Sequence, residues 1–177
     1  MGPILYAYPA TLTPDEEGRL LVLFPDLPET GTDGADEKEA LDEASDCLSE
    51  ALAARISDGE DIPRPSRVQP NQFEVTPSLR IALKAALHTV IREDQYTLAD
   101  VARAMKIDHT EARRLLDPKE STKEARLEEA LEALGYRSAF ALYDPGKHGR
   151  VLGVAGERQR VPTLRRAPRI EPKKGVA

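Results

Sequence analysis

Residues 97–116, TLADVARAMKIDHTEARRLL, predict two short helices joined by a tight turn. Thr97 stands three residues before Asp100, and Asp108 stands three before Glu111, so each pair places a side-chain acceptor at a helix start and a carboxylate in the first turn. Apolar residues follow both starts at helical spacing. Helices this short are unstable alone. We therefore expect them to pack against each other and against further helices of a small bundle.

The second of these helices carries polar and basic side chains opposite its apolar stripe. Ala112, Leu115 and Leu116 form the stripe. The other side is typical of a DNA-reading helix, because its groups pair with phosphates and with base edges. A helical hairpin with ordinary solvated charges is the alternative. We expect phosphate contacts from Arg103, Arg113 and Lys119, and base contacts from His109, Thr110 and Arg114.

This segment resembles the helix-turn-helix of Cro and repressor-type regulators. The apolar spacing and Ala102, the small residue where the two helices cross, carry the resemblance. Lys106 departs from it, since the family usually has glycine at the start of the turn. We expect Lys106 to adopt a left-handed backbone conformation at a cost of about 1 kcal/mol. The resemblance implies operator DNA as a partner, bound by a symmetric dimer.

Composition excludes several classes of protein. A chain of 177 residues with 40% hydrophobic and 32% charged residues is ordinary for a soluble protein with one core or two small ones. We expect a cytoplasmic protein, because no apolar run approaches the roughly 18 residues of a membrane span and the first residues lack a signal-peptide pattern. The single cysteine, Cys47, allows no internal disulfide and predicts an unreactive thiol. Three scattered histidines give no metal-ligand spacing, so we expect no metal and no cofactor.

Charge divides the chain into three regions. Residues 1–66 hold 4 Lys or Arg against 16 Asp or Glu, residues 67–136 hold 11 against 12, and residues 137–177 hold 10 against 3. An acidic front attracts a basic protein and repels nucleic acid. Together with the sequence patterns, this predicts domains at 1–75 and 76–136 and a basic, flexible tail at 137–177. The tail is either an arm that adds phosphate contacts or a solubilising segment without a specific partner.

The acidic front predicts an α+β fold, with an antiparallel sheet of three to four strands and one helix. We expect strands at 4–13, 19–24, 29–33 and 71–75, with Pro25 and Pro28 ending the second, and a helix from Asp36 to about Asp58 that stops at Gly59. Residues 61–70 hold three prolines and predict a stiff connector. An all-α bundle follows. Its first helix is expected to start at Thr76–Pro77, and its last to span 123–134, capped by Ser121 or Thr122 and stopped by Gly135. Dimer contacts are expected on the exposed side of this last helix or from a strand at 139–143.

A second resemblance covers residues 15–66. The motifs FPDLP at 24–28 and IPRPS at 62–66, with an acidic helix between them, are similar to the core of the HicB antitoxin family. The sequence departs at Glu29–Thr30, where the family commonly has Gly-Cys. The resemblance implies a partial ribonuclease-H-like domain that binds and silences a small basic HicA-like ribonuclease toxin. We expect toxin contacts from Phe24, Asp26, Leu27, Glu29, Asp33, Asp42 and Asp46.

Two other functions were weighed against this interpretation. One is a transcriptional regulator without a toxin, whose acidic domain senses a small ligand or mediates assembly. The other is an enzyme, which would need several carboxylates converging on two metal ions. The acids here fall in turns and on the outer side of the predicted helix, so we expect no catalytic residues and no enzyme.

Overall fold

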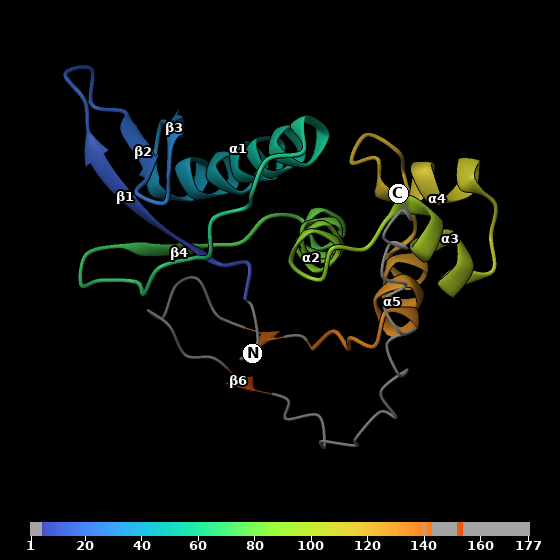
Figure 1. Cartoon of the computed structure of the whole chain (residues 1–177). Coiled ribbons are helices and arrows are strands. Elements are labelled where there is room, and N and C mark those ends of the chain that lie inside the picture. Colours follow the sequence, from blue (N-terminus) through green and yellow to red (C-terminus); the bar gives the residue numbers. More distant parts are fainter. Residues whose placement is uncertain (1–4, 140, 143–151, 154–177) are drawn as a thin grey trace, which may run out of the picture.

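The computed structural model describes residues 5–139, 141–142 and 152–153, and it shows an α+β protein (Figure 1). Four strands form an antiparallel sheet in the order β3-β2-β1-β4. The bounds of these strands are β1 Tyr8–Pro14, β2 Leu20–Phe24, β3 Leu27–Gly34 and β4 Phe73–Val75. The fold class predicted from the sequence is therefore confirmed.

The four strands lie at the positions predicted along the sequence, with one correction at Pro28. We expected Pro25 and Pro28 to end the second strand, but Pro28 lies inside β3. β3 is an edge strand of the sheet, where a residue without an N–H leaves no ladder partner unsatisfied. The pairing of β2 with β3 also shifts register between Leu23 and Phe24, which places the turn directly before Leu27.

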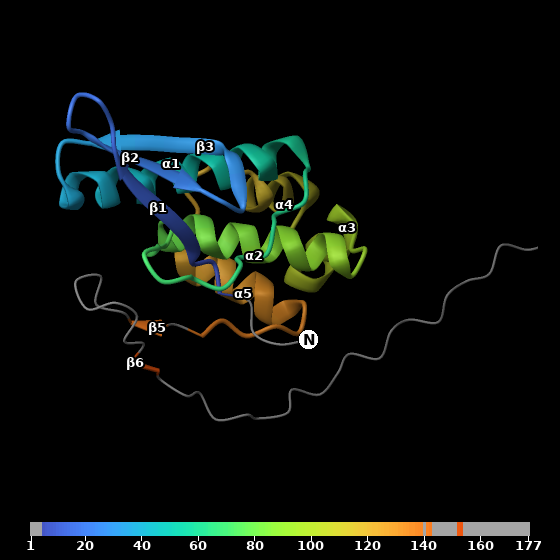
Figure 2. The same cartoon turned by 90° about the vertical axis from the view of Figure 1, so that its left-hand side faces the viewer.

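Helix α1, Glu37–Asp58, covers one face of the sheet (Figure 2). It begins as predicted, because the Asp36 side chain accepts from the Glu39 N–H at 2.9 Å while Glu39 accepts from the Ala35 N–H at 3.0 Å. It ends at Gly59 in a left-handed conformation, φ 68°. Residues spaced by four along α1 are fully buried against the sheet: Ala40, Ala44, Leu48 and Leu52.

Helix α2, Leu79–Glu93, belongs to two hydrophobic cores. Its Ile81 packs into the core between the sheet and α1. Leu83, Leu87 and Val90 lie in a second core with the helices that follow. α2 starts later than predicted, because its N-cap Ser78 has a non-helical ψ of 145°, and the Thr76 carbonyl before it accepts from the Ser45 hydroxyl of α1.

Polar contacts also fasten α2 to the first part of the chain. The Arg92 guanidinium donates to Asp61 at 2.7 Å and to the Gly59 carbonyl at 2.6 Å. His88 Nε2 lies 2.7 Å from the Glu60 carbonyl oxygen. The Tyr6 hydroxyl donates to Thr89 at 2.9 Å. The sheet domain and the helical bundle thus share one rigid element.

Three shorter helices complete the bundle: α3 Leu98–Met105, α4 His109–Leu116 and α5 Glu124–Ala133. The predicted cap of α5 is wrong. Its N-cap is Lys123, without a side-chain cap bond, because the Thr122 hydroxyl accepts from Lys84 instead. Gly135 stops α5 as expected, with φ 90° and the Tyr136 N–H donating to the Leu131 carbonyl at 2.8 Å.

Two short strands follow α5, β5 Ala141–Leu142 and β6 Leu152–Gly153, and they pair antiparallel. β5 falls inside the strand predicted at 139–143. The other predictions for the basic tail lie outside the described residues. Among the helices that the structure describes, none combines the length and the apolar character needed to cross a membrane.

The contact of His88 predicts a pH-dependent stability. Burial lowers the pKa of His88, the Glu60 carbonyl and Asp61 oppose that shift, and Arg92 adds to it. The folded protein therefore binds this proton less readily than the unfolded chain. The free energy of unfolding should fall as the pH drops through the ordinary histidine pKa of about 6.5, and this loss should end below the depressed folded-state pKa.

Urea unfolding at pH 7.5 and pH 5.5 measures this effect. His88→Gln keeps a donor near the Glu60 carbonyl but does not titrate, so its stability should fall less than that of the wild type over the same interval. Equal losses in both proteins would contradict the assignment to His88.

Candidate nucleic-acid and protein interfaces

The α3–α4 pair is built by caps at both helix starts and by a left-handed residue between them. Thr97 and Asp100 form a reciprocal capping box, with N–H donation to Thr97 Oγ1 at 3.2 Å and to Asp100 Oδ2 at 2.9 Å. Lys106 has φ 54° and ψ 44°, which confirms the expected left-handed turn. The Ile107 N–H donates to the Ala102 carbonyl at 3.0 Å, and Asp108 accepts from the Glu111 N–H at 2.8 Å.

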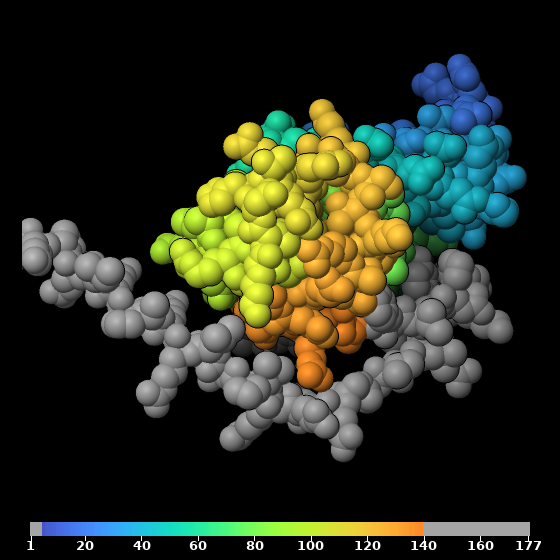
Figure 3. All heavy atoms as spheres, turned by 90° about the vertical axis from the view of Figure 1, so that its right-hand side faces the viewer, coloured from blue at the N-terminus to red at the C-terminus, as the bar shows by residue number. Residues whose placement is uncertain are grey.

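The apolar sides of α3 and α4 face inward. Val101 and Ala102 of α3 and Ala112 and Leu115 of α4 are buried. Leu115 and Val101 join the core that α2 and α5 complete. Figure 3 shows the residues of α3 and α4, coloured lime to yellow, on the face toward the viewer. The six residues predicted to contact DNA are all exposed: Arg103, His109, Thr110, Arg113, Arg114 and Lys119.

The acids of this region are engaged in local bonds. Asp108 caps α4 and Asp100 caps α3. Hydrogen bonds from Thr97, and after them the one from Arg103, hold the pKa of Asp100 below its usual range. Glu111 is paired with Arg126 of α5 at 2.7 Å. These carboxylates therefore either cap a helix or are neutralised by an ion pair.

Several cations on the same face are free by comparison. Arg113, Lys106 and Lys119 are exposed and form no ion pair within the described residues. Arg114 lies 3.7 Å from Glu120, a long contact between two largely exposed side chains. Such surface pairs are weak and are readily exchanged for a phosphate. The exposed side of α4 and its flanks can therefore bind a polyanion.

A buried lysine fixes the loop that follows α4. Lys84 of α2 is 2% exposed, and its ammonium group donates to the carbonyls of Asp117 and Glu120 and to the Thr122 hydroxyl. Burial lowers the pKa of Lys84, and the carboxylates of Asp117 and Glu120 oppose that shift. Lys119 lies between the two carbonyls that Lys84 holds. Lys84 thus positions an exposed cation, a role that the sequence pattern did not reveal because an isolated lysine on a helix usually faces solvent.

Two of the residues predicted to contact a toxin are buried in the acidic domain, which corrects the prediction for them. Phe24 is 1% exposed and Leu27 is fully buried, so both belong to the core under α1 and present no surface to a partner. Asp26 is half-buried, and it accepts from the Ser66 N–H at 2.8 Å, which ties the end of the proline-rich connector to the β2–β3 turn.

The other predicted acids are exposed. Glu29 binds Arg55 of α1, and hydrogen bonds from its own backbone N–H and from Arg55 lower the pKa of Glu29. Asp33 of β3 pairs with Arg19. Asp42 and Asp46 stand on the exposed side of α1, where Asp42 pairs with Lys38 one turn before it, at 2.6 Å.

Two leucines that we did not single out are exposed on the sheet. Leu21 and Leu23 of β2 face away from α1, while Val22 and Phe24 face it and are buried. The signal was present in the sequence. The run LLVLF at 20–24 is apolar at every position, whereas a strand with one solvated face normally alternates with polar residues.

Comparison with known proteins identifies the family. A family described as "HicB_like antitoxin of bacterial toxin-antitoxin system" matches residues 7–86. "Antitoxin HicB 1" of Photorhabdus laumondii is 33% identical over 135 residues, which is 76% of this chain and 86% of that protein. "Antitoxin HicB" of Escherichia coli K12 is 34% identical over 128 residues, 72% of this chain and 93% of that protein. This chain belongs to the HicB-like antitoxin family.

The matched residues of the HicB-like domain span the sheet, α1 and the first half of α2. The domain resemblance drawn from FPDLP and IPRPS is therefore confirmed. An alignment of 135 residues is longer than this segment, so the likeness to the Photorhabdus antitoxin continues beyond it.

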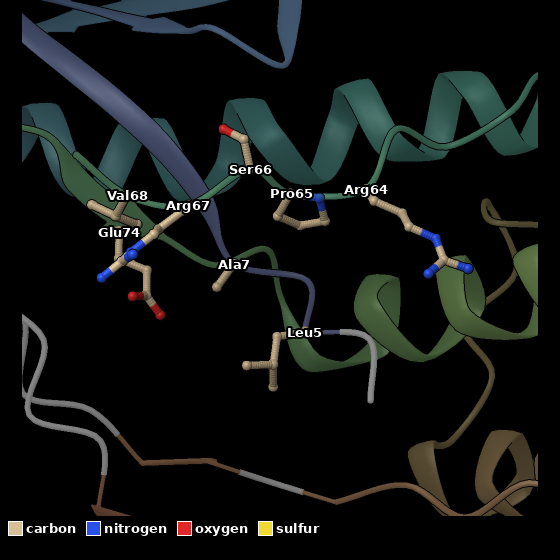
Figure 4. A pocket seen from close by; sticks show the side chains of 8 residues that line it. All are labelled: Leu5, Ala7, Arg64, Pro65, Ser66, Arg67, Val68 and Glu74. Atoms are coloured by element: carbon tan, nitrogen blue, oxygen red, sulfur yellow. The ribbon is translucent and has the colours of Figure 1, made fainter. Parts of the chain in front are cut away.

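A cavity between the connector and the sheet bears on the ligand-sensing alternative. It measures about 360 Å³ and opens to solvent between Leu5, Ala7, Val68 and Glu74 (Figure 4). Arg64, on its rim, extends toward α2, where it pairs with Glu93 at 2.8 Å. Small-molecule sites are usually enclosed, with a few polar groups aimed inward. This cavity is open and half of its lining residues are exposed, so it gives the ligand-sensing alternative no support.

The possible metal ligands and the single cysteine bear on reactive chemistry within the described residues. Within residues 5–139 no group of three or more His, Cys, Asp or Glu side chains could hold a metal ion. Burial raises the pKa of the Cys47 thiol, which donates to the Gly31 carbonyl at 3.4 Å. A raised pKa disfavours the nucleophilic thiolate, as expected for an unreactive thiol.

Lys84→Met tests the anchor of the α4–α5 loop. Methionine fills a similar space but leaves three oxygen acceptors without their donor, so the free energy of unfolding should fall by about 1–3 kcal/mol. Lys123→Met is the matched control, because the Lys123 side chain is exposed and makes no cap bond, and it should change stability by less than about 0.5 kcal/mol. Urea unfolding with equal losses in both variants would rule out the anchoring role.

Proposed function

We propose that this chain is the antitoxin of a toxin-antitoxin pair, that its acidic domain occludes a basic HicA-like ribonuclease toxin, and that its helical bundle represses its own operon. Membership of the HicB-like family carries the antitoxin role. The named relatives are antitoxins, and the match covers 86% and 93% of their length. Because both proposed partners act in the cytoplasm, the proposal includes a cytoplasmic location.

The exposed side of α4 supports the DNA-binding role. A recognition helix enters the major groove with the residues of its first turns toward the bases. His109, Thr110 and Arg114 are our base contacts, since all three lie on the exposed side of α4. Arg103, Arg113 and Lys119 flank them as phosphate contacts. A symmetric dimer would set two such helices about 34 Å apart and would bind a palindromic operator.

Charge supports the toxin-binding role. Residues 1–66 carry 16 acidic against 4 basic residues, and four of the predicted acids, Glu29, Asp33, Asp42 and Asp46, are exposed. Such a field attracts a cationic protein, raises its association rate and orients it on approach. It also repels nucleic acid, which leaves DNA to the bundle.

Co-expression with the product of a reading frame adjacent to its gene, where that frame encodes a small basic protein, tests the toxin-binding role. The two proteins should co-purify as a complex, and the complex should weaken as the salt concentration rises, because part of the attraction is electrostatic. A stable chain that captures no such partner while still binding its operator would favour a stand-alone regulator.

Operator binding gives a residue-level test. Arg114→Ala should lower the affinity for the operator by about 1–3 kcal/mol and relax the preference at one base pair. Lys119→Ala should weaken binding to all sequences alike and reduce the slope of log affinity against log salt by about 1. Lys38→Ala is the control, since Lys38 is an exposed cation of α1 in the other domain.

Filter binding across a salt series and footprinting of the upstream region provide the measurements. An Arg114→Ala protein with unchanged affinity and base preference would reject the base contact. A footprint without two-fold symmetry would reject the dimer on a palindrome.

A further inference from the structure

The open face of the sheet carries two exposed leucines on an inner strand. Leu21 is 38% exposed and Leu23 is 45% exposed, although β2 is hydrogen-bonded to β1 on one side and to β3 on the other. Their backbone is held in the middle of the sheet, so their exposure does not come from a frayed edge. Figure 2 shows the strands in front of α1, which covers only the opposite face.

The register defines what surrounds these leucines. Leu21 lies between Thr13 of β1 and Asp33 of β3, and Leu23 lies between Thr11 and Gly31. A Cβ atom at Gly31 would stand 2.9 Å from Leu23 Cδ2, so the Leu23 side chain lies against the bare backbone of β3. Residues two apart on a strand share one face, which makes the two leucines a continuous apolar strip.

Carboxylates lie at one end of this strip. The turn between β1 and β2 holds Asp15, Glu16 and Glu17, and it projects beyond the sheet (Figure 1). The Asp15 carboxylate accepts from the N–H groups of Glu17 and Arg19 and so shapes the turn. Glu16 and Glu17 are exposed and form no ion pair in the described part of the chain. Asp33 lies beside Leu21 and is paired with Arg19, so the unpaired negative charge at the strip comes from Glu16 and Glu17.

We propose that this open face, centred on Leu21 and Leu23, is the docking surface for the cationic partner protein. The inference rests on the proposed function, in which that partner is the basic toxin. An apolar centre with a charged rim is the usual layout of a protein interface. The acids of the rim fit a cationic protein and would repel a second copy of this acidic domain.

This placement separates two roles among the acids. α1 covers the other face of the sheet, so the exposed Asp42 and Asp46 point away from the strip. They contribute to the long-range field but do not touch the docked protein. Glu16 and Glu17, in the turn at the end of the strip, are the acids assigned to its rim.

The test uses the full chain and a small basic protein encoded by a reading frame adjacent to its gene, with the dissociation constant measured by titration calorimetry. Leu21→Thr with Leu23→Thr keeps β-forming side chains in the strand but removes the apolar strip. This double variant should bind at least tenfold more weakly than the wild type. Unchanged thermal unfolding and unchanged operator binding would show that the rest of the protein is intact.

Leu79→Thr is the matched control. Leu79 is 46% exposed at the start of α2, so it equals the strip leucines in exposure but lies outside the sheet. Its replacement should leave the dissociation constant within twofold. Asp42→Asn with Asp46→Asn should likewise change the constant by less than twofold at 0.3 M salt, where long-range attraction is screened.

The rim is tested through the association rate, which does not depend on the stability of the variant sheet. Glu16→Lys with Glu17→Lys alters only an exposed turn and should slow association at least threefold at low salt. Wild-type affinity in the double leucine variant, or an equal loss in Leu79→Thr, would overturn the docking surface and leave the antitoxin role standing. Failure of the wild-type chain to bind the basic protein at all would overturn the proposed function itself.

Discussion

The structure depends on the burial of α2 on two of its sides. Ile81 lies in the core of the sheet and α1, and Leu83, Leu87 and Val90 lie in the core of the bundle. Withdrawing α2 from either core would expose to water the apolar side chains that it buries there, which costs roughly 1.5–3 kcal/mol for each large side chain. The acidic sheet and the basic face of α4 are therefore held in one orientation rather than joined by a loose linker.

This constraint assigns the two charged surfaces to different parts of the molecule. The acids of α1 and of the β1–β2 turn stand on the sheet domain, while Arg113 and Lys119 stand on the bundle beyond α2. Opposite charges kept apart in this way do not pair with each other. Each surface stays available for a partner of the opposite sign.

Much of this arrangement could be predicted from local patterns. The capping residues Asp36, Thr97 and Asp108 set three helix starts correctly, because an N-cap bond involves only neighbours in the sequence. The start of α5 was predicted within one residue, but its cap was predicted wrongly, because Lys84, distant in the sequence, donates to the hydroxyl of Thr122. Local patterns could not reveal that competition.

For the candidate site residues, too, local patterns were predictable from the sequence and long-range pairing was not. Outward residues of α4 were found from its helical period, since a period fixes which side is buried. Phe24 was expected to contact a toxin because it belongs to the FPDLP motif, but the register of β2 points it toward α1. A one-residue difference in register exchanges the two faces of a strand, so the exposed leucines next to it escaped notice.

Lys106 has a consequence for any redesign of this protein. Its left-handed backbone holds a strain of about 1 kcal/mol that glycine would relieve. Glycine there would raise the melting temperature and would also delete a positive charge from the exposed face of the bundle. A higher melting temperature and a stronger attraction for polyanions thus make opposite demands on the residue at position 106. A stabilised variant would need to restore the lost charge nearby, for which the exposed Ala104 on the preceding helix offers a place.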